Sequence, residues 1–255
     1  TVPTQAGHTL SGTLLVPRKR SPEGVPAVVF ISGSGPQNRD GEVMNHRPFK
    51  VLADRLARKG IASFRYDDRG FGDSTGDFSS ATSLDFADDA AAALKHILKD
   101  PRIDPNKVGL IGHSEGGLIA PLVGAGMAPN YKDGDLPSFL VLLAAPGVPG
   151  HEVLKEQMKQ ILLSEGISPK ETEDICEAQA QLLDAVMANA ADDELLKKVV
   201  VLQDLQFKAN GMNESMTDEQ RAGVAEAALL SMKEPWMDLF LRMDPRDALR
   251  RVAMP

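Results

Sequence analysis

The chain has 255 residues and a mass of 27.4 kDa; 42% of the residues are apolar and 25% are charged. A chain this apolar can bury enough surface to offset the entropy lost on ordering, which excludes an intrinsically disordered protein. The net charge of −8 argues against a nucleic-acid-binding protein, which would need clustered lysine and arginine. No apolar run approaches about 18 residues, so no membrane partner is expected.

The composition changes near residue 150. Nineteen of the 22 glycines lie in residues 1–150, whereas eight of the ten methionines follow them. Glycine permits tight turns and close backbone approach, and methionine fills irregular gaps between helices. We therefore expect an α/β core in residues 1–150, a helical cap in 151–240 and a return to the core in 241–255.

Short apolar runs alternate with helical periods along the first part. Strands are predicted at 9–16, 26–32, 61–66, 108–111 and 139–144, and helices at 48–59, 84–99 and 118–127. Strands separated by helical segments indicate an open, mostly parallel sheet with right-handed crossovers. The fold class is therefore α/β.

The second part is predicted to contain at least three helices. Ser168, Pro169 and Glu171 combine an N-cap, a proline at the first helical position and a reciprocal glutamate. Thr217 repeats this capping pattern. Because open α/β sheets bind ligands at the carboxyl ends of their strands, a helical insertion after a strand is expected to act as a cap there. The lone cysteine of this part, Cys176, cannot form an internal disulfide and has no partner for a metal site.

The pentapeptide 112–116 fits the pattern G-x-S-x-G, with Ser114 at its centre. It follows a buried strand and opens a helix, which is the context of a nucleophile elbow. A strand that turns sharply into a helix leaves no room for a Cβ at Gly112 or Gly116, and it exposes the serine Oγ. The alternative is a glycine-rich turn with an incidental serine.

A nucleophilic serine needs donors for the oxyanion that forms on attack. The backbone N–H of Glu115 is one predicted donor, because it follows the nucleophile. The second is expected in the loop after strand 26–32, where the N–H of Ser34 is the first choice and that of Gly35 the second. The Glu115 side chain is not needed for this and is expected only to cap its helix. An ordinary strand-ending turn is the alternative for residues 32–36.

Two further loops carry charged residues. Residues 67–74 combine carboxylates, Arg69 and two glycines, which suggests a supporting loop pinned by an ion pair, with a solvated surface loop as the alternative. Residues 38–41 only superficially resemble a calcium loop, so no metal is expected. The dinucleotide fingerprint is absent from any strand-to-helix context, and no cofactor is expected.

These residues resemble the α/β-hydrolase superfamily, and more narrowly the EstD-like bacterial carboxylesterases, which are related to S9 prolyl-oligopeptidase and bile-acid acyltransferase catalytic domains. The segments that carry the resemblance are 32–40, 66–70, 112–117 and 235–255. The last resembles the approach of that group to its next core strand. Relatives often have histidine where this chain has Ser32, which leaves the donor N–H intact.

The resemblance breaks at the end of the sequence. In this fold the triad runs serine, acid, histidine along the chain, and the last two follow strands that come after the cap. The sequence stops at Pro255, where the first of these strands should begin. We therefore expect a truncated chain, with the acid and histidine beyond residue 255. His151 is kept as an alternative base. The other four histidines are expected to have only structural or surface roles; they are His8, His46, His96 and His113.

The resemblance implies a serine hydrolase of carboxylic esters that forms an acyl-enzyme on Ser114, although this chain by itself is expected to be inactive. An S9-type peptidase, an acyltransferase and a catalytically inactive binding module of the same fold remain alternatives. The expected partner is a small-molecule ester. Because the cap helices carry apolar stripes, a homodimer remains an alternative. Because the chain begins at Thr1, we expect that an N-terminal segment has been removed, which leaves the compartment open.

Overall fold

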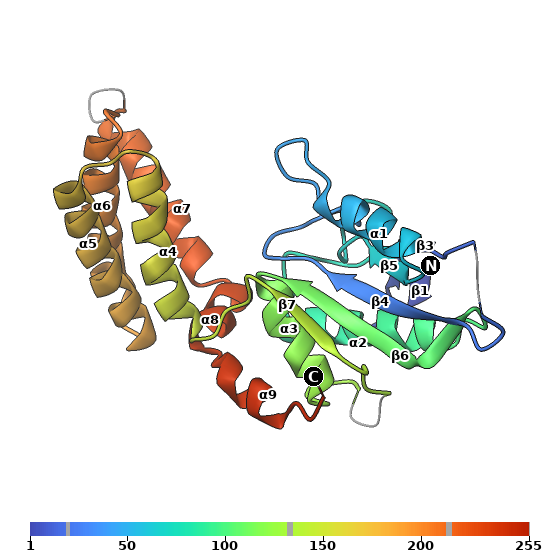
Figure 1. Ribbon diagram of the computed structural model, residues 1–255. Helices are drawn as coiled ribbons and strands as arrows, with labels where there is room; N and C mark the ends of the chain where they lie inside the picture. Colours follow the sequence, from blue (N-terminus) through green and yellow to red (C-terminus); the bar gives the residue numbers. More distant parts are fainter. Residues whose placement is uncertain (19–20, 132–134, 213–215, 255) are drawn as a thin grey trace. The chain divides into compact units, whose positions relative to one another are not determined.

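The computed structural model describes residues 1–18, 21–131, 135–212 and 216–254. The chain divides into two compact units (Figure 1): one contains Thr1–Gly147 and Pro245–Pro255, and the other contains Val148–Asp244. The domain boundaries expected at 150 and 240 lie close to these divisions, while the role of the second unit as a cap stays a proposal. Among the described helices, none is long and apolar enough to cross a bilayer.

The first unit is built on a sheet with the strand order β3-β5-β4-β6-β7. Its strands are β3 (Gly12–Leu15), β4 (Val25–Ile31), β5 (Ala62–Tyr66), β6 (Ile103–His113) and β7 (Leu140–Leu143). β3 runs antiparallel to β5, and the other pairs are parallel. The expected open, mostly parallel α/β sheet is therefore confirmed.

Two strands differ from their predicted extents. The strand expected at 9–16 is divided into β2 (Thr9–Leu10), which pairs with β1 (Val2–Pro3), and β3, which joins the main sheet. β6 begins at Ile103, well before the predicted start, because Ile103 pairs with Val25 across a register shift in β4. The pairings of β3 and of Ile103 depend on strands that are distant in the sequence, whereas β2 pairs with the nearby β1.

Helices lie on both faces of the main sheet (Figure 1). They are α1 (Pro48–Arg58), α2 (Ser83–Leu98) and α3 (Glu115–Gly124). α1 packs against a core that includes Val28 and Phe30 of β4, with the rings of Phe30 and Phe49 4.9 Å apart. α1 ends before Gly60, whose φ of 86° suits the predicted glycine at the helix end. α2 and α3 lie on the opposite face, where the alanines of α2 are buried.

The chain after the second unit returns to the first as α9 (Pro245–Arg251), which packs against α3. The return to the core was expected over residues 241–255. Residues 241–244 belong to the second unit instead, and the described residues 245–254 contribute a helix to the first unit. Pro245 and Ala248 of this helix are buried.

The second unit is helical throughout its described residues. Its helices are α4 (Gly150–Ser164), α5 (Pro169–Met187), α6 (Asp192–Ala209), α7 (Asp218–Met232) and α8 (Pro235–Arg242). They share a core of leucine, isoleucine, valine and alanine side chains. The predicted N-caps are confirmed: Ser168 accepts a hydrogen bond from the N–H of Glu171, and Thr217 forms a capping box with Gln220.

Candidate active site

Ser114 occupies the sharp turn between β6 and α3. Its φ of 54° and ψ of −119° lie outside the regions that L-residues ordinarily adopt. The neighbouring strand β7 fixes the turn, because the Ser114 N–H donates a hydrogen bond to the carbonyl of Leu143 at 2.9 Å. Strain of this kind persists only where the surrounding structure imposes it, and it concentrates at functional sites.

The glycines of the turn allow the close packing that imposes this conformation. A Cβ added at Gly112 would overlap the carbonyl of Gly116, and one at Gly116 would overlap the carbonyls of Ile31 and Ser32. The strand, the turn and the start of α3 therefore contact one another through backbone. This is the crowding expected from the G-x-S-x-G pattern.

The loop after β4 lies directly against the turn. An ideal Cβ built on Gly33 would lie 3.1 Å from the Cβ of Ser114 and 3.3 Å from Nδ1 of His113. Ser34 follows Gly33 and is exposed, while Glu115 opens α3 on the other side of Ser114. The structure thus brings together Ser114 and the two segments expected to supply oxyanion donors.

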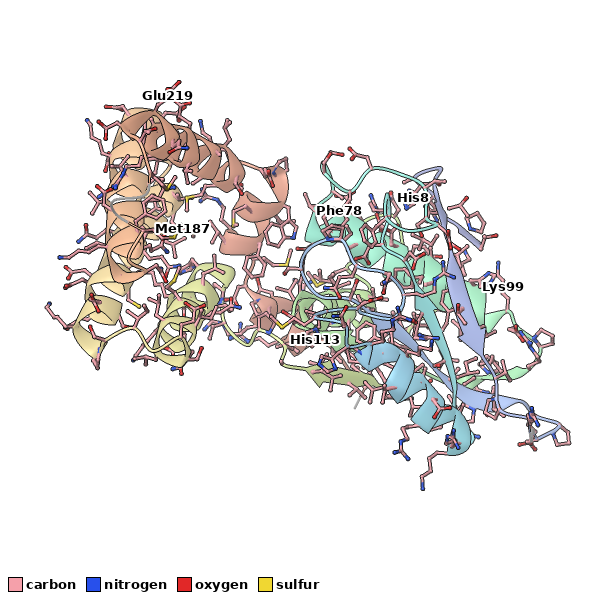
Figure 2. All side chains as sticks on the ribbon, turned by 90° about the horizontal axis from the view of Figure 1, so that it is seen from above. His8, Phe78, Lys99, His113, Met187 and Glu219 are labelled. Atoms are coloured by element: carbon pink, nitrogen blue, oxygen red, sulfur yellow. The ribbon has the colours of Figure 1, made fainter. Side chains whose placement is uncertain are left out.

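None of the described histidines is hydrogen-bonded to Ser114. His113 is exposed, and Figure 2 shows it well apart from His8. His8 is bonded through Nε2 to Asp89 at 2.8 Å and through Nδ1 to Thr4 at 3.0 Å. In the second unit, Nδ1 of His151 lies 3.0 Å from the carbonyl oxygen of Leu241. The remaining two lie on α2 (His96) and in an exposed turn (His46).

Three buried carboxyl groups surround a small cavity beneath the turn. Asp68, Asp89 and Glu115 are 7%, 2% and 2% exposed. The cavity measures about 10 Å³ and is also lined by Ser32, Tyr66 and apolar side chains. Glu115 accepts a hydrogen bond from the Ser83 hydroxyl at 2.6 Å. Its side chain is therefore part of a buried polar cluster, and the expectation that it only caps the helix was incomplete.

The loop at 67–74 is anchored through its first three residues. Asp67 binds the Arg39 guanidinium through both oxygens, at 2.9 and 2.5 Å, and the Nε of Arg69 donates to Asp89 at 2.7 Å. Asp67, Asp68 and Arg69 are all buried, so the alternative of a solvated surface loop is wrong for this part. The predicted pinning by ion pairs is confirmed, with partners outside the loop.

Arg39, which lies within residues 38–41, is bonded to Asp67 of the loop that follows β5. Arg39 places its guanidinium and its backbone N–H on the Asp67 carboxylate. Burial disfavours the charged form of Asp67, but these donors together lower its pKa below the usual value. The pair is a positioning element for the loop that follows β4.

Burial raises the pKa of Asp68 from its usual 3.8 to about 7. Hydrogen bonds from Ser32 and from the Gln37 N–H favour the carboxylate, whereas the neighbouring Asp89 and Glu115 disfavour it. Burial also raises the pKa of Asp89, which Arg69 and His8 counteract, and it raises that of Tyr66. Burial is thus the largest cause of the raised pKa of Asp68, Asp89 and Tyr66.

The pKa of Asp68 predicts a specific pH dependence of stability. Between about pH 4 and about pH 7 the folded state keeps a proton on Asp68 that the unfolded chain has lost, so the free energy of unfolding falls as pH rises. We expect the stability of the wild type relative to Asp68→Asn to fall by about 3 kcal/mol over this range. Urea titrations of both proteins across the range measure the difference. A difference that stays constant or grows with pH would contradict the assignment.

The sequence interpretation placed Asp68 in a supporting loop without giving it a role of its own, and it did not identify Asp89 or Ser83 as part of the site. One signal was available for Asp68, because it follows the end of β5, and the carboxyl ends of neighbouring parallel strands meet at one edge of a sheet. For Asp89 and Ser83, which lie on α2, no local pattern indicated the partners.

The chain is similar to known hydrolases. Residues 41–165 match a protein family described as serine aminopeptidase, S33. The chain is 33% identical over 152 residues to esterase EstD of Thermotoga maritima, an alignment that covers 60% of this chain and 34% of EstD. The chain thus spans about a third of the length of that relative.

The solved structures that match part of this chain include two esterases. Est1E of Butyrivibrio proteoclasticus, solved with ferulic acid bound, is 24% identical with a TM-score of 0.44, covering 57% of this chain and 52% of its own. The Pyrococcus furiosus esterase PF2001 is 17% identical with a TM-score of 0.48, covering 64% of this chain and 53% of its own. The family match and EstD confirm the resemblance to α/β hydrolases expected from residues 32–40, 66–70 and 112–117.

Proposed function

We propose that this chain, which has the fold of the α/β hydrolases and resembles esterase EstD, carries the nucleophile and oxyanion site of a serine hydrolase that cleaves small carboxylic esters. Ser114 is the proposed nucleophile. The backbone N–H groups of Ser34 and Glu115 are the proposed oxyanion donors.

The strained backbone of Ser114 is the observation that carries this proposal. Ser114, at φ 54°, lies between the end of a parallel strand and a fully buried helix, at the edge of the sheet where such folds bind ligands, and it is partly exposed. Gly33 lies against this serine, so a carbonyl carbon above Oγ would meet the loop on one side and the start of α3 on the other.

The reaction follows from these placements. Oγ of Ser114 attacks the ester carbonyl carbon and loses its proton to a general base, while the carbonyl oxygen becomes an oxyanion. Fixed N–H donors stabilise that charge without having to reorganise. The ester C–O bond then breaks, the alcohol leaves with the proton, and water hydrolyses the acyl-enzyme to the acid and free Ser114. Because no described histidine is bonded to Ser114, the proposal assigns the base to none of them.

A peptidase is the second candidate, and one observation favours it. The family that matches residues 41–165 is described as serine aminopeptidase, and an amide would be attacked by the same serine. Hydrolysis of p-nitrophenyl esters compared with aminoacyl p-nitroanilides separates the two. We expect the esters to be cleaved faster.

The place of Val148–Asp244 between β7 and α9 supports the proposal that this unit is a cap.

The proposed nucleophile is tested by covalent labelling. The natural gene product that contains these residues is treated with a fluorophosphonate, digested and analysed by peptide mass spectrometry. We expect one adduct, on the peptide that contains Ser114, because an activated serine reacts with this reagent and an ordinary serine does not. Heat-denatured protein serves as the control and is expected to remain unlabelled.

Two results would contradict the proposal. An adduct on another serine would move the nucleophile elsewhere. The absence of any adduct on the folded protein would favour the catalytically inactive binding module, which retains the pocket without an activated serine.

A further inference from the structure

We propose that Asp68 is a positioning residue, whose carboxyl group holds the loop of residues 32–37 in the conformation that presents its N–H groups to Ser114. This inference rests on the proposed function, since it concerns the same oxyanion site. Asp68 touches no reacting atom and acts through the loop.

The carboxyl group of Asp68 binds both ends of this loop. The Ser32 hydroxyl donates to Oδ1 at 2.5 Å, and the Gln37 N–H donates to Oδ2 at 2.8 Å. The backbone adds a third bond, because the Asp68 N–H donates to the Gln37 carbonyl at 3.1 Å. The residues between these two ends include Gly33, which lies against Ser114, and Ser34, the proposed donor. A single side chain therefore closes the segment that carries the oxyanion donor.

Asp68 is itself held firmly. It is the second residue after β5, and its neighbours on both sides are fixed by ion pairs: Asp67 with Arg39 and Arg69 with Asp89. With 7% of its surface exposed, its carboxyl group has little room to change rotamer or to exchange its partners for water. A bound group held in this way transmits its own position to the loop.

The other oxyanion donor is supported from the same cavity. The side chain of Glu115, whose backbone N–H is the second proposed donor, lines the cavity with Asp68 and is bonded to Ser83. Hydroxyl groups from two elements, Ser32 and Ser83, thus satisfy the two carboxyl groups beneath the two donors. The contact with Asp68 depends on the Ser32 hydroxyl.

The test uses two variants that remove one contact each. Ser32→Ala deletes the hydroxyl that donates to Asp68, and Asp68→Asn replaces the carboxyl group with an amide that cannot accept at both positions. In each variant we expect kcat for a p-nitrophenyl ester to fall about 10- to 100-fold, while KM stays within about twofold of the wild-type value. The reason is that an oxyanion donor stabilises charge that develops mainly in the transition state, so its displacement affects kcat more than KM. The Gln37 amide is expected to exchange with solvent about tenfold faster or more, as measured by NMR.

Ser80→Ala is the matched control. The Ser80 hydroxyl donates to the Asp77 carboxylate at 2.6 Å, the same kind of bond as that of Ser32, but in an exposed segment and without a bond to the loop of residues 32–37. Its kcat, KM and Gln37 exchange are expected to equal those of the wild type. Ser32→Ala carries the test by itself if Asp68→Asn does not fold.

The outcomes separate this inference from the proposed function. If Ser32→Ala hydrolyses ester at the wild-type kcat, or raises KM without lowering kcat, the positioning role is overturned. If the wild-type gene product has no activity that depends on Ser114, the proposed function fails. The exchange rate of the Gln37 amide in Ser32→Ala then tests whether Asp68 holds the loop of residues 32–37. Faster exchange supports Asp68 as the residue that holds the loop, whereas unchanged exchange overturns it.

Discussion

Replacement of Ser114 by alanine is expected to lower kcat for ester hydrolysis by about 10⁴- to 10⁶-fold in the natural gene product that contains these residues. Alanine removes only Oγ, the atom proposed to form the acyl-enzyme. The Cβ that lies next to Gly33 stays in place, so the strained turn and the loop against it are retained. The effect should therefore fall on the chemical step and leave folding almost untouched.

Initial rates with p-nitrophenyl acetate measure this effect, and thermal unfolding checks the fold. The melting temperature of Ser114→Ala is expected to lie within about 2 °C of the wild type, because one small surface group is lost. Ser138→Ala is the control, since its hydroxyl bonds to the Asn106 carbonyl at 2.8 Å in an exposed loop and has no proposed role in catalysis. Retention of more than a tenth of the wild-type kcat by Ser114→Ala would rule out a covalent role for this serine.

Replacement of Gly112 by alanine is expected to lower the free energy of unfolding of the first unit by more than about 4 kcal/mol. The new methyl group would overlap the carbonyl of Gly116 and the backbone nitrogen of Gly117. A side chain could rotate away from such a contact, but backbone cannot. Relief requires β6 and α3 to separate, and every residue of α3 is buried.

Domains have total stabilities of about 5–15 kcal/mol, so this loss would remove a large part of the stability of the first unit. Urea denaturation followed by circular dichroism and by tryptic digestion measures this loss. Gly147→Ala is the control, because nothing lies within 4 Å of a Cβ at that position, and its stability should change by less than about 0.5 kcal/mol. A Gly112→Ala protein as stable as this control would mean that the turn is looser than the structure shows.

Local sequence patterns were sufficient to predict an element wherever the residues that contact one another are also close in the sequence. The apolar run at 26–32 forms β4, and the period over 48–59 forms α1 with its glycine end. The caps at Ser168 and Thr217 depend on residues three positions away. The turn at 112–116 is also local, because its glycines are required by contacts within the strand–turn–helix segment and by the adjoining strand end.

Long-range pairing decided the rest. Ile103 joins β6 because Val25 lies beside it, although Pro105 is a poor strand residue in isolation. Ser32 and Asp68 lie 36 positions apart, and Ser83 and Glu115 lie 32 apart, so no spacing rule connects them. The sequence by itself determined the fold class, the order of strands and helices and the candidate nucleophile Ser114. Only the tertiary structure decided which buried carboxyl groups support the loop beside it, because hydrogen bonds between distant segments depend on how the sheet brings the strand ends together.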